Sequence, residues 1–150
     1  MSKPKTGSKP RKTRLPKKEK LHPVNFVIKI PIYNYDIMFS AEEMDSSLWE
    51  NLERRGVPKP EIPSFIVFPG HGRCVISSGG QMLIRLRYLP VNGYWKGVLA
   101  HEIQHSVEMK FEDYGMTLCK QSSEAYAYLI GYITQMIYEK LERCQRRKRN

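Results

Sequence analysis

The chain has 150 residues, of which 41% are hydrophobic, so it can build one globular domain with a true core but hardly two. Its formal net charge is +10, yet residues 21–139 carry a net charge of −3. The excess lies at the ends, where residues 1–20 hold nine basic side chains and one acidic one, and residues 140–150 hold six and one. The overall charge therefore gives no support to a basic nucleic-acid-binding fold.

The ends of the chain are predicted to be tails. The first twenty residues contain one leucine, no aromatic residue and several prolines, a composition that buries too little to offset its ordering entropy. No apolar stretch of a secretion signal follows them, and no apolar run approaches the ~20 residues of a membrane span. The cysteines are odd in number and widely spaced, which suits a reducing compartment: Cys74, Cys119 and Cys144. We expect a disordered basic tail at 1–22, a domain at 23–142, a basic tail at 143–150, and a soluble, cytoplasmic protein.

The domain begins with a strand. Phe26, Ile28 and Ile30 alternate with more polar residues, which is the period of a strand with one buried face. Pro31 makes this an edge strand or ends its pairing, and residues 33–39 continue the extended chain.

A helix over about 41–55 follows. Ser40 and Glu43 form a capping-box pattern, and Gly56 ends the segment. Apolar residues recur at i+4 within it: Met44, Leu48 and Leu52.

Three short apolar runs come next, at residues 64–68, 73–77 and 81–89, separated by turns rich in glycine, proline and serine. The simplest arrangement is an antiparallel meander with one covered face. Helical patterns then occupy about 93–111 and 122–144, joined by a loop around 113–115. This order predicts an α+β fold in which a small antiparallel or mixed sheet packs on two long helices.

The sequence HEIQH lies on the first long helix. Residues four apart share a helix face, so His101 and His105 can offer two imidazole nitrogens to one metal ion. Glu102 is beside them and can reach a water held by that ion. The pattern predicts two zinc ligands and a general base on one rigid element. The alternative is a chance grouping of core and surface residues.

An apolar stripe at i+4 spacing is expected to bury this helix: Trp95, Leu99, Ile103, Val107 and Phe111. The histidines fall on an adjacent arc, so we expect them to line an interior cleft. Glu124 opens the next helix, which is apolar on most sides, and a carboxylate on its inner surface would need a compensating charge such as a metal. The alternative is that Glu124 favours a helix amino terminus capped by Ser122 or Ser123.

Together, HEIQH and the downstream SSEAYAYLIGYI resemble the gluzincin branch of the zincin metallopeptidases, especially minimal single-domain forms from phages and bacteria. The resemblance implies a zincin-like fold with zinc ligands His101, His105 and Glu124 and with Glu102 as base. It also implies an edge strand, matched in position by residues 81–89, that holds an extended peptide substrate, and an intracellular setting that includes a phage-infected host. The third histidine of the metzincins is absent.

Other polar residues have two interpretations each. Tyr128, one turn beyond Glu124, is a candidate oxyanion donor or a core residue. Asp113 is a candidate to orient a ligand histidine, or a turn former. Glu108 and Glu112 are alternative ligands, or else they lie on a solvated face or orient a ligand histidine. His71 fits a loop residue better than a ligand.

The motif and the charge distribution leave three classes of function. The first is a Zn²⁺-dependent peptidase, whose open site has three protein ligands. The second is a nucleic-acid-associated protein that uses a zincin-like scaffold and binds nucleic acid or another polyanion without sequence preference through residues 3–20 and 143–149. The third is a regulatory protein that binds metal without catalysis. The presence of Glu102 beside the histidines favours the first.

Overall fold

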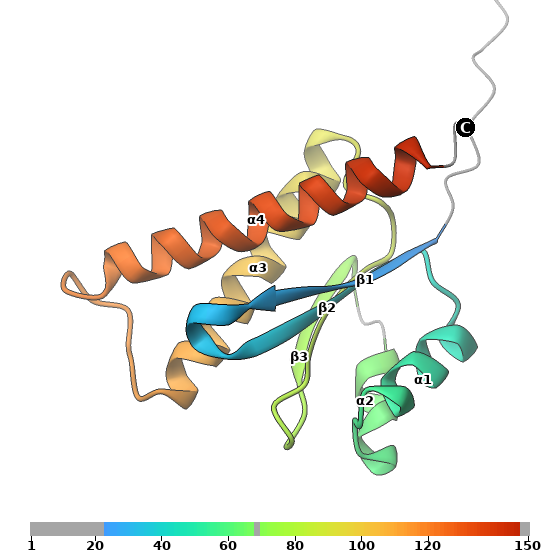
Figure 1. The fold of residues 1–150 in the computed structure, drawn as a ribbon, viewed down its shortest axis with the longest axis horizontal. Helices are drawn as coiled ribbons and strands as arrows, with labels where there is room; N and C mark the ends of the chain where they lie inside the picture. The colour runs from blue at the N-terminus through green and yellow to red at the C-terminus, as the bar shows by residue number, and fades with distance from the viewer. Residues whose placement is uncertain (1–22, 68–69, 148–150) are drawn as a thin grey trace, which may run out of the picture.

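A computed structural model describes residues 23–67 and 70–147, which form an α+β domain (Figure 1). Its strands are β1 (Val24–Ile30), β2 (Tyr35–Ala41), β3 (Gly72–Ile76) and β4 (Met82–Leu86). Its α-helices are α1 (Asp45–Arg54), α2 (Ile62–Ile66), α3 (Gly93–Asp113) and α4 (Ser123–Arg146), with short 3-10 turns at Pro31–Tyr33 and Lys59–Glu61. The α+β class, the first strand and both long helices are confirmed. The predicted tail at 1–22 lies outside the described residues.

The strands form one mixed sheet in the order β1-β2-β4-β3. β1 pairs with β2 and β3 with β4 in antiparallel fashion, whereas β2 and β4 run parallel, with Ile37 opposite Met82. β1 is an edge strand that ends immediately before Pro31, as the missing proline N–H requires. The antiparallel meander predicted for residues 64–89 is wrong, because only its β3–β4 part is present and β4 then pairs with β2 in parallel.

The segment predicted as a strand at residues 64–68 forms part of α2 instead. Pro63 occupies the first turn of this helix, where its missing N–H costs nothing. Ile62 and Phe65, three residues apart, are both buried. The apolar run therefore follows a helical spacing that its short length concealed.

Both faces of the sheet are covered, which corrects the expected single covered face. Strand residues such as Phe39 and Ile84 pack with α3 and α4, while their neighbours Met38 and Leu83 pack with α1 and α2. Figure 1 shows the two helical layers on opposite sides of the sheet. Because side chains alternate along a strand, cover on both sides buries β2 and β4 along nearly their whole length.

The Ser40–Glu43 pattern serves the strand rather than a helix cap. Ser40 is buried in β2, and α1 begins only at Asp45. The Glu43 carboxylate accepts hydrogen bonds from the side chains of Ser40 and Asn25, both at 2.7 Å, as well as from Ser47 and Asn51 on α1. The same carboxylate thus joins the end of the β1–β2 hairpin to α1.

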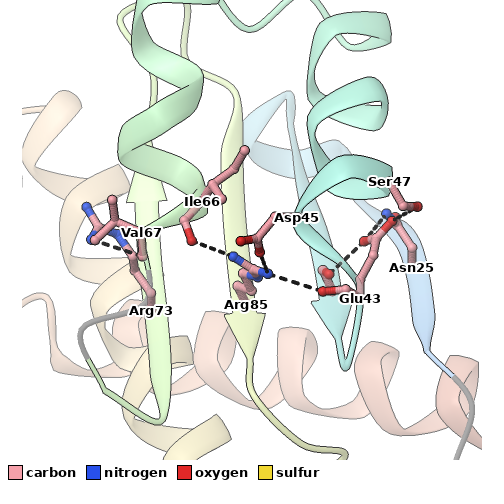
Figure 2. A network of polar contacts seen from close by, with 9 residues as sticks. Asn25, Glu43, Asp45, Ser47, Ile66, Val67, Arg73 and Arg85 are labelled. Carbon is pink, nitrogen blue, oxygen red and sulfur yellow. Dashed lines mark hydrogen bonds and ion pairs between the residues drawn. The ribbon is translucent and has the colours of Figure 1, made fainter.

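A buried arginine anchors α1 and α2 to the sheet (Figure 2). Arg85 lies in β4 with 5% of its surface exposed. Its guanidinium donates to the Ile66 carbonyl at 2.6 Å, to the Asp45 carboxylate at 2.6 Å and to the Glu43 carbonyl at 3.2 Å. One side chain therefore binds the end of α2 and the beginning of α1.

The long helices form the other layer. The predicted stripe of α3 is confirmed, with Trp95 only partly buried at its start: Leu99, Ile103, Val107 and Phe111. α4 buries a stripe of its own: Tyr126, Leu129, Ile133, Ile137 and Leu141. No helix within residues 23–67 and 70–147 is long and apolar enough to cross a membrane.

Replacing Arg85 with methionine should lower the free energy of unfolding by about 2–3 kcal/mol, because buried acceptors at Ile66 and Glu43 lose a charged donor. Urea denaturation measures the change. Arg54→Met is the matched control, since Arg54 is exposed on α1 and its loss should cost no more than about 0.5 kcal/mol. Equal effects of the two substitutions would contradict the anchoring role.

Candidate functional site

α3 positions the candidate site. Its amino end is capped by Asn92, whose side-chain oxygen accepts from the backbone N–H of Trp95 at 3.1 Å. Its apolar stripe fixes the rotation of the helix. His101 and His105 each follow a residue of that stripe by two positions, or about 200° of turn. They therefore lie on the outer face, where His101 is exposed and His105 partly exposed, and the expected interior cleft is wrong.

The two histidine rings converge. The Nε2 atoms of His101 and His105 are 3.0 Å apart, and the rings are nearly perpendicular at 84°. Two imidazole nitrogens at about 2.0–2.1 Å from one tetrahedral zinc ion lie roughly 3.3 Å apart. A shared ion therefore fits this pair with a shift of a few tenths of an ångström.

Glu108 supports the orientation of one ring. A carboxylate oxygen of Glu108 lies 3.4 Å from Nδ1 of His105, and the other oxygen accepts from the Gln104 amide at 2.8 Å. A carboxylate beside Nδ1 favours a proton on that atom and leaves Nε2 free to bind a metal. Of the two interpretations of Glu108, a residue that orients a histidine fits its position better than a ligand.

Glu102 is buried between α3 and the sheet, with 6% of its surface exposed. Burial raises the pKa of its carboxyl group above the ordinary value, and the nearby imidazoles of His101 and His105 oppose that rise. The carboxylate also accepts a hydrogen bond from the backbone N–H of Cys74 in β3. The predicted base is thus held at a fixed place beside the histidine pair.

Gly72 makes this contact possible. A Cβ atom on Gly72 would lie 2.8 Å from both Cγ and Oε1 of Glu102 and 2.7 Å from a methyl group of Val98. Such distances are too short for any side chain. The sequence marked Gly72 only as part of a turn, and its spacing from HEIQH gave no sign that β3 would lie against α3.

The edge strand beside α3 is β3, and the assignment of residues 81–89 as the edge is wrong, since β4 lies between β2 and β3. The carbonyl of His71 accepts from Arg87, and the N–H of Ser77 donates to Gln81. Because backbone groups alternate in direction along a strand, the intervening even-numbered residues point away from β4. Within the described chain, the edge of the sheet at β3 is thus formed by the backbone groups of Gly72, Cys74 and Ile76.

Glu124 and Tyr128 do not join the histidine pair. Both are exposed, on the side of α4 opposite its buried stripe, so the expected inner position of Glu124 and the core position of Tyr128 are wrong. Among the residues that the structure describes, no three His, Cys, Asp or Glu side chains are grouped to hold a metal ion. The part played by Glu124 as third ligand stays a prediction.

Asp113 and His71 have other partners. Asp113 is the last residue of α3, and its carboxylate lies 3.3 Å from the ammonium group of Lys110. It is two turns from His105, too far along the helix to orient that ring. His71 precedes β3 and packs edge-on against the rings of Tyr94 and Trp95.

No protein-family model, curated protein or solved structure matches the chain. The site is therefore interpreted from its own geometry.

A Gly72→Ala substitution should displace Glu102 or separate β3 from α3, at a cost of about 1–3 kcal/mol in the free energy of unfolding. Gly97→Ala is the control, because a Cβ at this exposed helical position meets nothing within 4 Å and should stabilise α3 by about 0.5–1 kcal/mol. Thermal and urea unfolding of both variants measure the difference. A neutral Gly72→Ala would show that the close approach is not required.

Proposed function

We propose that the chain is a zinc-dependent metallopeptidase with a zincin-like fold of the gluzincin type. The observation that carries the proposal is the pair of Nε2 atoms 3.0 Å apart, with the buried carboxylate of Glu102 beside them. The resemblance of HEIQH and SSEAYAYLIGYI to that family agrees with it. The position of β3 as an edge strand beside the same helix supports a peptide as substrate.

His101 and His105 would hold the zinc ion, and Glu124 is the candidate third ligand. Because the Glu124 side chain is exposed, this role requires the beginning of α4 to reorient toward the histidine pair. When bound, zinc supplies the Lewis acidity that polarises a carbonyl group and activates water.

Glu102 would move the proton. Its buried carboxyl group has a raised pKa, which brings it closer to neutral pH, where an acid or base works most efficiently. The N–H of Cys74 holds the carboxylate, so Glu102 can take a proton from the attacking water and deliver it to the leaving amine. The chemistry is hydrolysis of a peptide bond.

β3 would hold the substrate. The outer edge of β3 lies beside Glu102, which already accepts from the N–H of Cys74, and an extended peptide could add to the remaining backbone groups of this edge as another strand. This backbone pairing would bring the peptide bond near the carboxylate.

The other two classes gain less support. Residues 3–20 lie outside the described residues, and Arg143 and Arg146 form ion pairs with Glu139 and Glu142 on α4. Binding of nucleic acid or polyanions by these segments therefore rests on the sequence. A regulatory metal site has no need for a buried carboxylate beside its ligands.

The purified full-length protein should bind about one zinc ion per chain, and His101→Ala or His105→Ala should abolish this binding. Glu124→Gln should weaken it, while the control Glu50→Gln, an exposed glutamate on α1, should leave it unchanged. Titration with zinc against a competing chelator measures each affinity. A wild-type chain that binds no zinc would overturn the proposal, and an unaffected Glu124→Gln would exclude Glu124 as ligand.

Glu102→Gln should keep zinc and lose turnover by roughly 10²–10⁴-fold, because the amide cannot accept the proton. Cleavage of a mixed peptide library, followed by mass spectrometry, avoids the need to know the substrate. Full activity in this variant would show that another group is the base.

A further inference from the structure

Four aromatic rings from three segments of the chain gather at the amino end of α3. This aromatic cluster consists of His71, Tyr88, Tyr94 and Trp95. Trp95 is at its centre, with ring centroids 4.9 Å from Tyr88, 5.2 Å from Tyr94 and 5.4 Å from His71. Tyr88 and Tyr94 remain 51% and 59% exposed, so the cluster presents apolar surface to solvent.

Hydrogen bonds fix the backbone segments that carry the aromatic cluster. The backbone N–H of Arg87 donates to the carbonyl of His71 at 3.0 Å, and Asn92 caps the turn that carries Tyr94 and Trp95. Each ring meets its neighbours edge to face, the geometry that aromatic pairs prefer. A ligand that lies on these rings would therefore lose little free energy in ordering them.

The aromatic cluster adjoins the candidate site. His71 is followed directly by Gly72, whose backbone lies against Glu102. Tyr94 precedes His101 by seven residues, which places both on one face of α3 about 10 Å apart along its axis. A peptide strand advances about 3.3 Å per residue, so two or three residues span that distance.

We infer that the aromatic cluster is a specificity subsite for a bulky aromatic or aliphatic side chain of a peptide. The inference rests on the proposed function, because it uses the outer edge of β3 as the peptide-binding strand. A peptide along Ile76, Cys74 and Gly72 runs on to His71 and its neighbours. The side chain that meets the cluster is then two or three residues from the bond beside Glu102. Rigid, partly exposed aromatic residues are the usual anchors of such recognition.

The test measures binding in the absence of turnover. The full-length Glu102→Gln protein, loaded with zinc, is titrated against fluorescein-labelled decapeptides of one mixed sequence that differ only in a single phenylalanine, leucine, alanine or aspartate. Fluorescence anisotropy should give at least a tenfold tighter dissociation constant for phenylalanine or leucine than for alanine at one position. Equal affinity for all four peptides, or no binding of any, would overturn the inference.

Variants of the exposed rings assign the preference to the cluster. Tyr94→Ser and Tyr88→Ser in the same background should each reduce the preference several-fold, because the phenylalanine and leucine peptides lose more affinity than the alanine peptide. Ile32→Ser is the matched control, since Ile32 is an exposed apolar residue on the β1–β2 connection. A preference that survives both tyrosine substitutions would place the subsite elsewhere and overturn the inference.

Two further readouts separate this inference from the proposed function. Aromatic-selective binding without cleavage of any peptide by the zinc-loaded wild type would support the subsite and overturn the peptidase. Cleavage without preference at that position would do the reverse. Analytical ultracentrifugation completes the test, because a dimer that Tyr94→Ser dissociates would make the cluster a contact between copies and overturn the subsite.

Discussion

The packing of α3 on the sheet determines the rest of the candidate site. The stripe that contains Leu99, Ile103 and Val107 faces the core, and this orientation of the helix leaves two distinct flanks. One flank presents His101 and His105 to solvent, and another places Glu102 against β3. A rotation of 100° in one direction would expose the Glu102 carboxylate, and the same rotation in the other direction would bury His105. The apolar stripe thus selects which residues can do chemistry, although it contains none of them.

Local periodicity predicted the elements that are long or regular. α3 and α4 have helical stripes that persist over several turns, and β1 alternates up to Pro31. α2 was missed because five residues are too few to separate a helical from an extended spacing. The parallel pairing of β2 with β4 joins residues more than forty positions apart, and nothing in either strand specifies that partner.

Within the candidate site, too, local features could be predicted from the sequence and long-range contacts could not. The spacing of His101 and His105 predicted their convergence because both lie on one helix. The contacts of Glu102 with Gly72 and Cys74 depend on where a distant hairpin docks, so they required the structure. The direction of Glu124 was mispredicted because small residues such as Ala127 and Gly131 make the outer face of α4 look as apolar as its core face.

The hydrogen bond from Cys74 to Glu102 also places a carboxylate at the outer edge of β3, which bears on self-association of the protein. An edge strand such as β3 can pair with the same strand of another copy and start aggregation. Two copies joined along β3 would bring two buried Glu102 carboxylates toward one interface, where their repulsion and desolvation oppose assembly. A neutral peptide meets only one such charge. The carboxylate would therefore oppose the pairing of β3 with a second copy more strongly than its pairing with a peptide.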